Sequence, residues 1–239
     1  VRDFTSEWLP VPWVPRDIRA EGDWRYDPRS LAVVAVGDNR KVATRFLNYA
    51  VTSWDLAPSP AEVALATAGD PGDEGLSLAL PPELDPQVVD LARELTSSAA
   101  TDGEAILTLL GWLRSGPFTY STDEVAGTTM ETVSDFLLTS RTGYCEQFSG
   151  GLAILARAID IPSRVVVGFL PGVERGSGSF DVSVRDMHAW TEVYLDGFGW
   201  VAFDPTPSGA PGVAPVPTPT APPSAEPEPT TEVTEAPVP

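Results

Sequence analysis

The sequence predicts an α+β fold in which a helix that starts at Cys145 packs on an antiparallel sheet, preceded by a small β-rich domain. Apolar residues recur in steps of four and three from Phe148 to Ile159, which is the spacing of one buried helical face. Residues 188–195 and 200–203 alternate as two strands around a turn at 196–197. A chain of 239 residues is long enough for one or two domains of this kind.

The first domain is predicted over residues 1–68, where short extended runs replace any helical period. Residues 31–36, 43–47 and 49–53 have the composition of strands, and the proline-rich stretch 9–15 suggests an edge or a surface strap. The unit contains four tryptophans whose chemistry suits a carbohydrate or peptide platform: Trp8, Trp13, Trp24 and Trp54. Aromatic residues in a small β unit are more often core, so no binding role is assigned.

A polar linker is predicted at residues 69–79 and a second domain at 80–207. The linker is acidic but lacks the ligand pattern of an EF-hand. Helices are expected at 86–96, at 105–113 after a capping-box sequence, and in a short form at 132–138. Ile161-Pro162 ends the helix of Cys145, because proline lacks an N–H donor, and a strand at 164–170 and a glycine-rich loop at 171–181 follow.

Residues 208–239 hold ten prolines among Thr, Ala, Glu and Ser. Such a composition buries too little apolar surface to offset chain entropy. We predict a disordered, proline-rich spacer there.

The candidate reactive residues are Cys145, His188 and Asp204, and the chain has no other cysteine or histidine. Cys145 lies in the first turn of its helix, where unpaired N–H groups and the helix dipole favour a thiolate. A nucleophilic thiol needs a base, and the base needs a group that orients it. A lone cysteine is more often an inert buried side chain, and it is the downstream histidine and strand-end aspartate that favour chemistry.

These motifs, in their order along the chain, resemble the transglutaminase-like superfamily. Gly143-Tyr144-Cys145 matches its Gly-x-Cys motif, 188–190 its His-Ala-Trp motif, and 204–205 its Asp-Pro motif. The resemblance covers about residues 80–207 and implies a papain-like/transglutaminase-like core. The branch that the chain resembles most is the extracytoplasmic part of bacterial membrane-anchored protein-glutamine gamma-glutamyltransferases (TgpA-like).

The resemblance also suggests two further site residues. Tyr120 is a candidate for holding the oxyanion, since the superfamily places an aromatic side chain from this upstream segment near the nucleophile; a packing tyrosine is an equal alternative. Trp190 follows His188 by two residues and could shield its ring on the same face of the strand, but it could equally be a core aromatic.

Composition limits the partners. The net charge of −19 argues against a nucleic-acid partner, which would need a basic stripe. One cysteine and one histidine disfavour a zinc site, and the proposed chemistry needs neither metal nor cofactor. No apolar run of eighteen residues is present, and the resemblance implies that membrane segments lie outside this stretch, which would then face the extracytoplasmic side.

The resemblance therefore implies transfer of an acyl group from a protein or peptide glutamine carboxamide to an amine, through a thioester on Cys145. Two alternatives stay open. The same triad could act as a cysteine peptidase or amidase on peptide or cell-wall bonds, or the fold could be a non-catalytic cell-surface binding module. The sequence does not identify the substrate or the oligomeric state.

Overall fold

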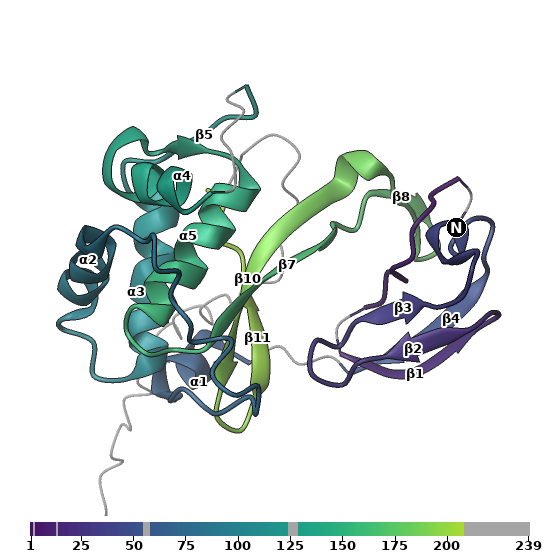
Figure 1. Cartoon of the computed structure of the whole chain (residues 1–239), viewed down its shortest axis with the longest axis horizontal. Coiled ribbons are helices and arrows are strands. Elements are labelled where there is room, and N and C mark those ends of the chain that lie inside the picture. Colours follow the sequence, from purple (N-terminus) through teal and green to yellow (C-terminus); the bar gives the residue numbers. More distant parts are fainter. Residues whose placement is uncertain (2, 13, 55–57, 124–128, 208–239) are drawn as a thin grey trace, which may run out of the picture.

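The computed structural model describes residue 1 and residues 3–12, 14–54, 58–123 and 129–207. Trp13 and the predicted spacer at 208–239 therefore lie outside the described residues. The predicted α+β fold is confirmed: a small β unit lies beside a larger part in which helices cover a sheet (Figure 1).

The N-terminal unit consists of two short antiparallel strand pairs. Strand β1 (Pro15–Ala20) pairs with β4 (Tyr49–Ser53), and β2 (Trp24–Tyr26) pairs with β3 (Val33–Ala35), followed by the 3₁₀ turn η1 (Arg40–Val42). The strand expected at 43–47 is instead a series of turns. The buried hydroxyl of Thr44 donates to the Phe4 carbonyl and accepts from the Ser6 N–H, which ties this stretch to the N-terminal segment.

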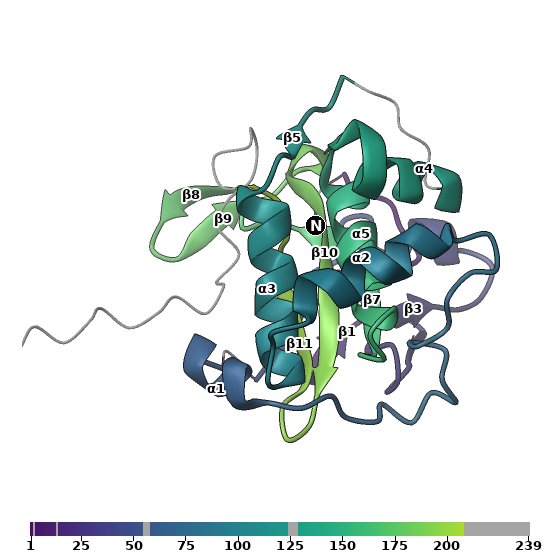
Figure 2. The ribbon, with the colours of Figure 1, turned by 90° about the vertical axis from the view of Figure 1, so that its left-hand side faces the viewer.

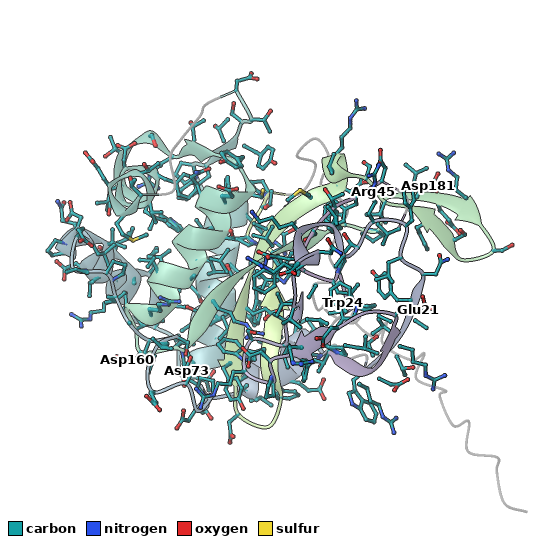
Figure 3. The ribbon with its side chains drawn as sticks, turned by 45° about the vertical axis from the view of Figure 1, so that its right-hand side comes forward. Glu21, Trp24, Arg45, Asp73, Asp160 and Asp181 are labelled. Carbon is teal, nitrogen blue, oxygen red and sulfur yellow. The ribbon has the colours of Figure 1, made fainter. Side chains whose placement is uncertain are left out.

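The three described tryptophans of this unit do not form its core. Trp8 and Trp54 are 55% and 53% exposed, and the Arg16 guanidinium lies 4.8 Å from the centre of the Trp54 ring. Trp24 lines a shallow surface hollow, and its Nε1 donates to the Glu21 carbonyl (Figure 3). No binding role is assigned to these rings.

Helix α1 (Pro60–Leu65) belongs by its contacts to the larger part, although the sequence placed residues 60–68 in the first domain. Its N-cap Ser59 forms a capping box with Glu62, and Val63 is fully buried against α3 (Asp102–Ser115). The Ala68 N–H donates to the Asp102 carboxylate at 2.7 Å. The packing therefore divides the chain before α1 rather than at residue 68.

The predicted linker 69–79 also packs on the larger part. The Ser163 N–H donates to the Ser77 carbonyl at 3.0 Å, and Arg157 Nη1 donates to the Ala79 carbonyl at 2.9 Å. These bonds attach the segment to the end of the Cys145 helix and the start of the next strand.

The larger part holds one three-stranded antiparallel sheet, in the order β11-β10-β7. Figure 2 shows α2, α3 and α5 on one face of this sheet and the N-terminal unit behind it. The remaining bounds are α2 (Pro86–Thr96), β5 (Thr119–Tyr120), α4 (Met130–Asp135), the π-helical turn η2 (Phe136–Ser140), β6 (Thr142–Gly143), α5 (Cys145–Arg157), β7 (Ser163–Phe169), β8 (Val173–Gly176), β9 (Ser179–Asp181), η3 (Val184–Asp186), β10 (Met187–Leu195) and β11 (Gly199–Phe203). The loop expected at 171–181 is the β8–β9 hairpin, which reaches towards the N-terminal unit (Figures 1 and 3).

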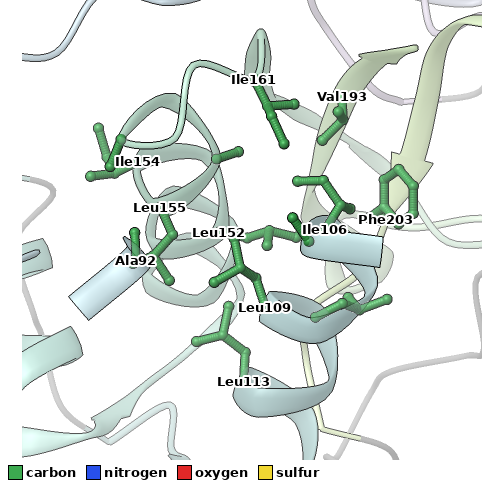
Figure 4. Close-up of a cluster of buried hydrophobic side chains, with 14 of the residues drawn as sticks. Ala92, Ile106, Leu109, Leu113, Leu152, Ile154, Leu155, Ile161, Val193 and Phe203 are labelled. Atoms are coloured by element: carbon green, nitrogen blue, oxygen red, sulfur yellow. The ribbon is translucent and has the colours of Figure 1, made fainter. Parts of the chain in front are cut away.

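The core lies between α5, α3 and the sheet (Figure 4). Leu152 and Leu155 of α5 are fully buried, as are Ile106 and Leu109 of α3. Burying one such side chain stabilises the fold by about 1.5–3 kcal/mol. The helical spacing recognised in the sequence is thus the face that holds α5, and with it Cys145, against the sheet.

The opposite face of the sheet carries a buried ion pair. Glu192 of β10 is fully buried, and its Oε2 accepts from Arg164 Nε at 2.8 Å. Arg164 also stacks 4.1 Å from the centre of the Trp200 ring and donates to the Arg29 carbonyl at 2.9 Å. This group therefore bonds the sheet directly to the N-terminal unit.

Candidate active site

Cys145 is the first residue of α5 and is partly exposed. The turn before it is tightly packed: a Cβ on Gly143 would lie 2.8 Å from the Gln147 Cβ, so only glycine fits. The buried Gln147 side chain accepts from the Tyr144 N–H at 3.1 Å and fixes the start of the helix. The sulfur thus stands at the positive end of a helix dipole.

Tyr120 reaches Cys145 through a short parallel pairing. Strand β5 pairs with β6 so that Tyr120 lies opposite Gly143, and the Ser121 N–H donates to the Gly143 carbonyl at 2.8 Å. The Tyr120 hydroxyl is hydrogen-bonded to the backbone of Cys145. Burial raises the pKa of Tyr120, and the neighbouring Cys145 adds to this effect, so the phenol stays protonated.

His188 lies at the start of β10 and is 3% exposed. Its Nε2 lies 2.9 Å from Asp204 Oδ2, and the ring is also hydrogen-bonded to the Cys145 side chain, which leaves Nδ1 to face the sulfur. Burial alone would lower the pKa of His188. The hydrogen bonds and negative charges of Asp204 and Cys145 outweigh burial and raise this pKa to about 9.

Asp204 follows β11 and is held at three atoms. Its Oδ2 faces His188, its Oδ1 accepts from the Thr206 N–H at 2.9 Å, and its carbonyl accepts from Arg114 Nε at 2.7 Å. Burial tends to raise the pKa of this carboxyl, but the bonds from His188 and Thr206 prevail and lower it. The aspartate is therefore an ionised, fixed acceptor for the ring.

Arg114 and Thr206 were not identified from the sequence. Thr206 lies two residues after Asp204, in the Asp-Pro-Thr turn, so its N–H is an Asx-turn donor that the local sequence allows. Arg114 lies in the last turn of α3, ninety positions from Asp204, and no local pattern links the two. The described part of the chain thus brings Cys145, His188, Asp204 and Tyr120 close together, and their catalytic roles stay a prediction.

Trp190 has a different environment. Its Nε1 lies 3.4 Å from Glu192 Oε1, and its ring covers Gly168, where a Cβ would lie 2.5 Å from the indole. These contacts support the alternative of a packing aromatic on the sheet. The shielding of His188 by this ring remains a prediction.

Two further features concern ions and membranes. Over the described ranges, no three His, Cys, Asp or Glu side chains are grouped so that they could hold a metal ion. No helix within those ranges has the length and apolar character needed to cross a membrane.

Comparison with known proteins gives this geometry a context. The family model described as "Transglutaminase-like superfamily" matches residues 89–205, which include Cys145, His188 and Asp204. A protein-glutamine gamma-glutamyltransferase of Pseudomonas aeruginosa is 33% identical over 173 residues, which is 72% of this chain and 25% of that protein. The uncharacterized protein YebA of Bacillus subtilis is 33% identical over 134 residues, 53% of this chain and 18% of that protein. The chain thus spans a quarter or less of these relatives.

Solved structures give the same result. Two crystal structures of the periplasmic domain of TgpA from Pseudomonas aeruginosa, one of them bound to ethylmercury, superpose with a TM-score of 0.66. Their sequences are 26% and 27% identical to this chain, and each match covers 85% of it and 69% or 66% of the solved chain. The similarity therefore extends beyond the residues of the family model.

Proposed function

Residues 89–205 form a domain of the transglutaminase-like superfamily, and on this basis we propose that the chain transfers acyl groups from glutamine carboxamides to amines, with Cys145 as nucleophile. One observation carries the proposal. A buried His188–Asp204 pair is hydrogen-bonded to a cysteine at the start of a helix. Nucleophile, base and orienting group are then within reach of one another.

In the first half of the reaction, the Cys145 sulfur attacks the Cδ carbon of the glutamine side chain. The C–N bond breaks, and His188 gives its proton to the departing nitrogen, which leaves as ammonia. The product is a thioester between Cys145 and the γ-acyl group. Asp204 stays ionised and holds the ring through Nε2, so that Nδ1 faces the sulfur and the leaving group.

In the second half, an amine attacks the thioester carbon. His188, now neutral, takes the proton from the amine as the C–N bond forms, and the C–S bond breaks to restore the thiolate–imidazolium pair. Water in place of the amine would give glutamate. Both products arise from the same intermediate, so the choice depends on which nucleophile reaches it.

The oxyanion of each tetrahedral intermediate needs donors near the Cys145 backbone. The Tyr120 hydroxyl, which is held protonated by burial and is bonded to that backbone, is one candidate, and the Cys145 N–H is the other. A good donor of this kind stabilises the transition state by about 3–4 kcal/mol.

The relatives guide the choice of substrate and location. One similar protein carries the name protein-glutamine gamma-glutamyltransferase, which supports glutamine as acyl donor. The similar solved domain is described as periplasmic, which supports an extracytoplasmic position for this stretch, attached to a membrane through other segments of a longer protein. Protein or peptide substrates are proposed as partners, without a metal or cofactor.

Incubation with a glutamine-containing protein and a labelled primary amine, followed by mass spectrometry of all products, tests the proposal. We expect the amine on glutamine side chains with the parent and none with Cys145→Ala. Glutamate alone would identify an amidase, and cleaved main chain a peptidase; either result would overturn the proposed transfer. No product from a folded parent that still alkylates at Cys145 would favour a binding module.

A further inference from the structure

Strand β7 forms one edge of the three-stranded sheet. The pattern of hydrogen bonds between β7 and β10 can be deduced from the two ends of β7. There the Tyr194 N–H donates to the Pro162 carbonyl, and the Leu170 N–H donates to the Asp186 carbonyl. Bonded and non-bonded pairs alternate along an antiparallel ladder, and the register between these ends has no bulge. The even-numbered residues of β7 therefore bond to β10.

The odd-numbered residues of β7 direct their backbone groups away from the sheet. Ser163 shows this directly, since its N–H bonds to the Ser77 carbonyl on the open side. By the same alternation, Val165 and Val167 direct their N–H and C=O groups to that side, and within the described ranges no partner is found for them.

The side chains along this edge are apolar and exposed. Val165 is 44% exposed and Val167 is 62% exposed, and the residue between them is also valine. Proteins usually protect an edge strand with charges, prolines or a covering segment, because free backbone groups and apolar side chains invite another strand. The central part of β7 has none of these protecting features, so it is an edge strand that is open to pairing with another strand.

This edge continues into the proposed active site. In the register, Val167 lies opposite Ala189, the residue after His188. Ser163 Oγ bonds to the Ala153 carbonyl of α5, so the odd side chains of β7 face the helix that begins at Cys145. Figure 2 shows β7 and α5 running along each other on this side of the sheet.

We propose that the edge of β7 at Val165 and Val167 binds the acyl-donor peptide as an added β-strand, with its glutamine side chain directed to Cys145. The proposal rests on the proposed function and names the form in which the donor binds. An extended peptide would satisfy the free backbone groups, and its alternate side chains would cover the two valines.

Docking of this kind explains why the substrate would be a side-chain amide rather than a main-chain amide. Strands in a sheet are about 4.8 Å apart, so the main chain of the added strand would lie roughly 9–10 Å from β10, which carries His188. A main-chain amide held there stays away from the sulfur. A long side chain on the α5 face can reach back over Val167, and glutamine places a carboxamide at its end.

Two variants at one position test the docking. Val167→Pro removes the edge N–H without removing a bond to β10, since proline is tolerated where an edge N–H faces solvent. We expect about a tenfold higher KM for a glutamine peptide, as the loss of a hydrogen bond predicts. Val167→Thr keeps the N–H and the branched shape, and its KM should stay within about threefold of the parent. The rate of Cys145 alkylation by iodoacetamide should match the parent in both, which shows an intact site.

N-methylated peptides test the same docking by changing the peptide instead of the protein. Only alternate amides of an added strand point to β7, so methylation should weaken binding at every second residue around the glutamine. Binding is measured by polarisation of a labelled peptide and does not require turnover. Uniform sensitivity, or an unchanged KM for Val167→Pro, would overturn the proposal.

The measurements separate the two proposals. Peptide binding with the alternating pattern but without product would leave the edge site standing and refute the transfer reaction. Product formation with a KM unaffected by Val167→Pro would support the transfer reaction and refute the edge site. Sedimentation of the parent as a dimer that Val167→Pro converts to a monomer would assign the edge to a second copy of the chain and overturn peptide docking.

Discussion

Replacing Asp204 by asparagine should shift the pH dependence of the reaction. Asp204 and Cys145 raise the pKa of His188 from 6.5 to about 9 against the effect of burial. This difference corresponds to about 3 kcal/mol in favour of the imidazolium. Asparagine keeps the shape of Asp204 but removes its charge, so the pKa of His188 should fall by roughly one unit or more.

The assay is the rate of amine incorporation across pH, with Asp196→Asn, in the exposed turn after β10, as control. The parent should lose activity as the pH rises past about 9, because the imidazolium then loses its proton. In Asp204→Asn this loss of activity (the alkaline limb of the pH profile) should begin at a lower pH. The maximal rate should also fall by about 10²–10⁴-fold, since the amide favours the wrong tautomer of His188. An unchanged alkaline limb with a near-parental rate would refute the assigned role of Asp204.

The same pKa predicts a change in stability. Because the folded-state pKa of His188 is raised above 6.5, its stabilising contribution is complete below pH 6.5 and is lost as the pH rises through about 9. Thermal unfolding of the parent should therefore show a fall in Tm over this range. Asp204→Asn should show a smaller fall.

Two further predictions concern the packing that holds the site. Gly103→Ala should destabilise the fold by about 3 kcal/mol in urea unfolding, because its Cβ would lie 1.7 Å from the Val63 carbonyl oxygen of α1. Gly111→Ala, in the same helix but with open space around its Cβ, should instead stabilise by about 0.5–1 kcal/mol; equal effects would contradict the docking of α1 on α3. Burial raises the pKa of Glu192 to about 7 against the opposing charge of Arg164, so parental stability should fall by up to about 3 kcal/mol as the pH rises from 4.5 through 7. Glu192→Gln should remove this slope in pH-dependent melting, and an unchanged slope would show that Glu192 does not cause it.

The sequence predicted best those elements whose signals are local. The helix expected at 86–96 is α2, with Asp85 as its N-cap, and the strand expected at 49–53 is β4. The helix of Cys145 was recognised because its buried face repeats over three turns. In each case the pattern that forms the element lies within the element itself.

Short or irregular elements were missed for physical reasons. Helix α1 has six residues and only Val63 buried, too few for a period, although its Ser59–Glu62 capping box was present in the sequence. The stretch at 43–47 has strand composition, but Phe46 has a φ of 58° and is 66% exposed, since no neighbouring strand pairs with it. These outcomes depend on tertiary partners that the local sequence does not specify.

The same distinction between local and tertiary signals applies to the residues of the site. Cys145, His188 and Asp204 could be chosen as candidates because their residue types are chemically specific and occur in a recognisable order, and the structure places them side by side. The bond from Arg114 to the Asp204 carbonyl joins α3 to the end of β11, and it depends on how the helix crosses the sheet. The candidates for reactive groups were thus accessible from the sequence, whereas the groups that hold them in place became visible only in the fold.

Trapping the acyl-enzyme tests the central claim most directly. A glutamine peptide is incubated with the chain in the absence of amine, the reaction is quenched with acid, and the intact mass is measured before digestion locates the adduct. The mechanism predicts a mass increase equal to the peptide less one ammonia, located at Cys145, discharged by added primary amine and absent from Cys145→Ala. Transfer product formed by Cys145→Ala, or an adduct located on another residue, would contradict it.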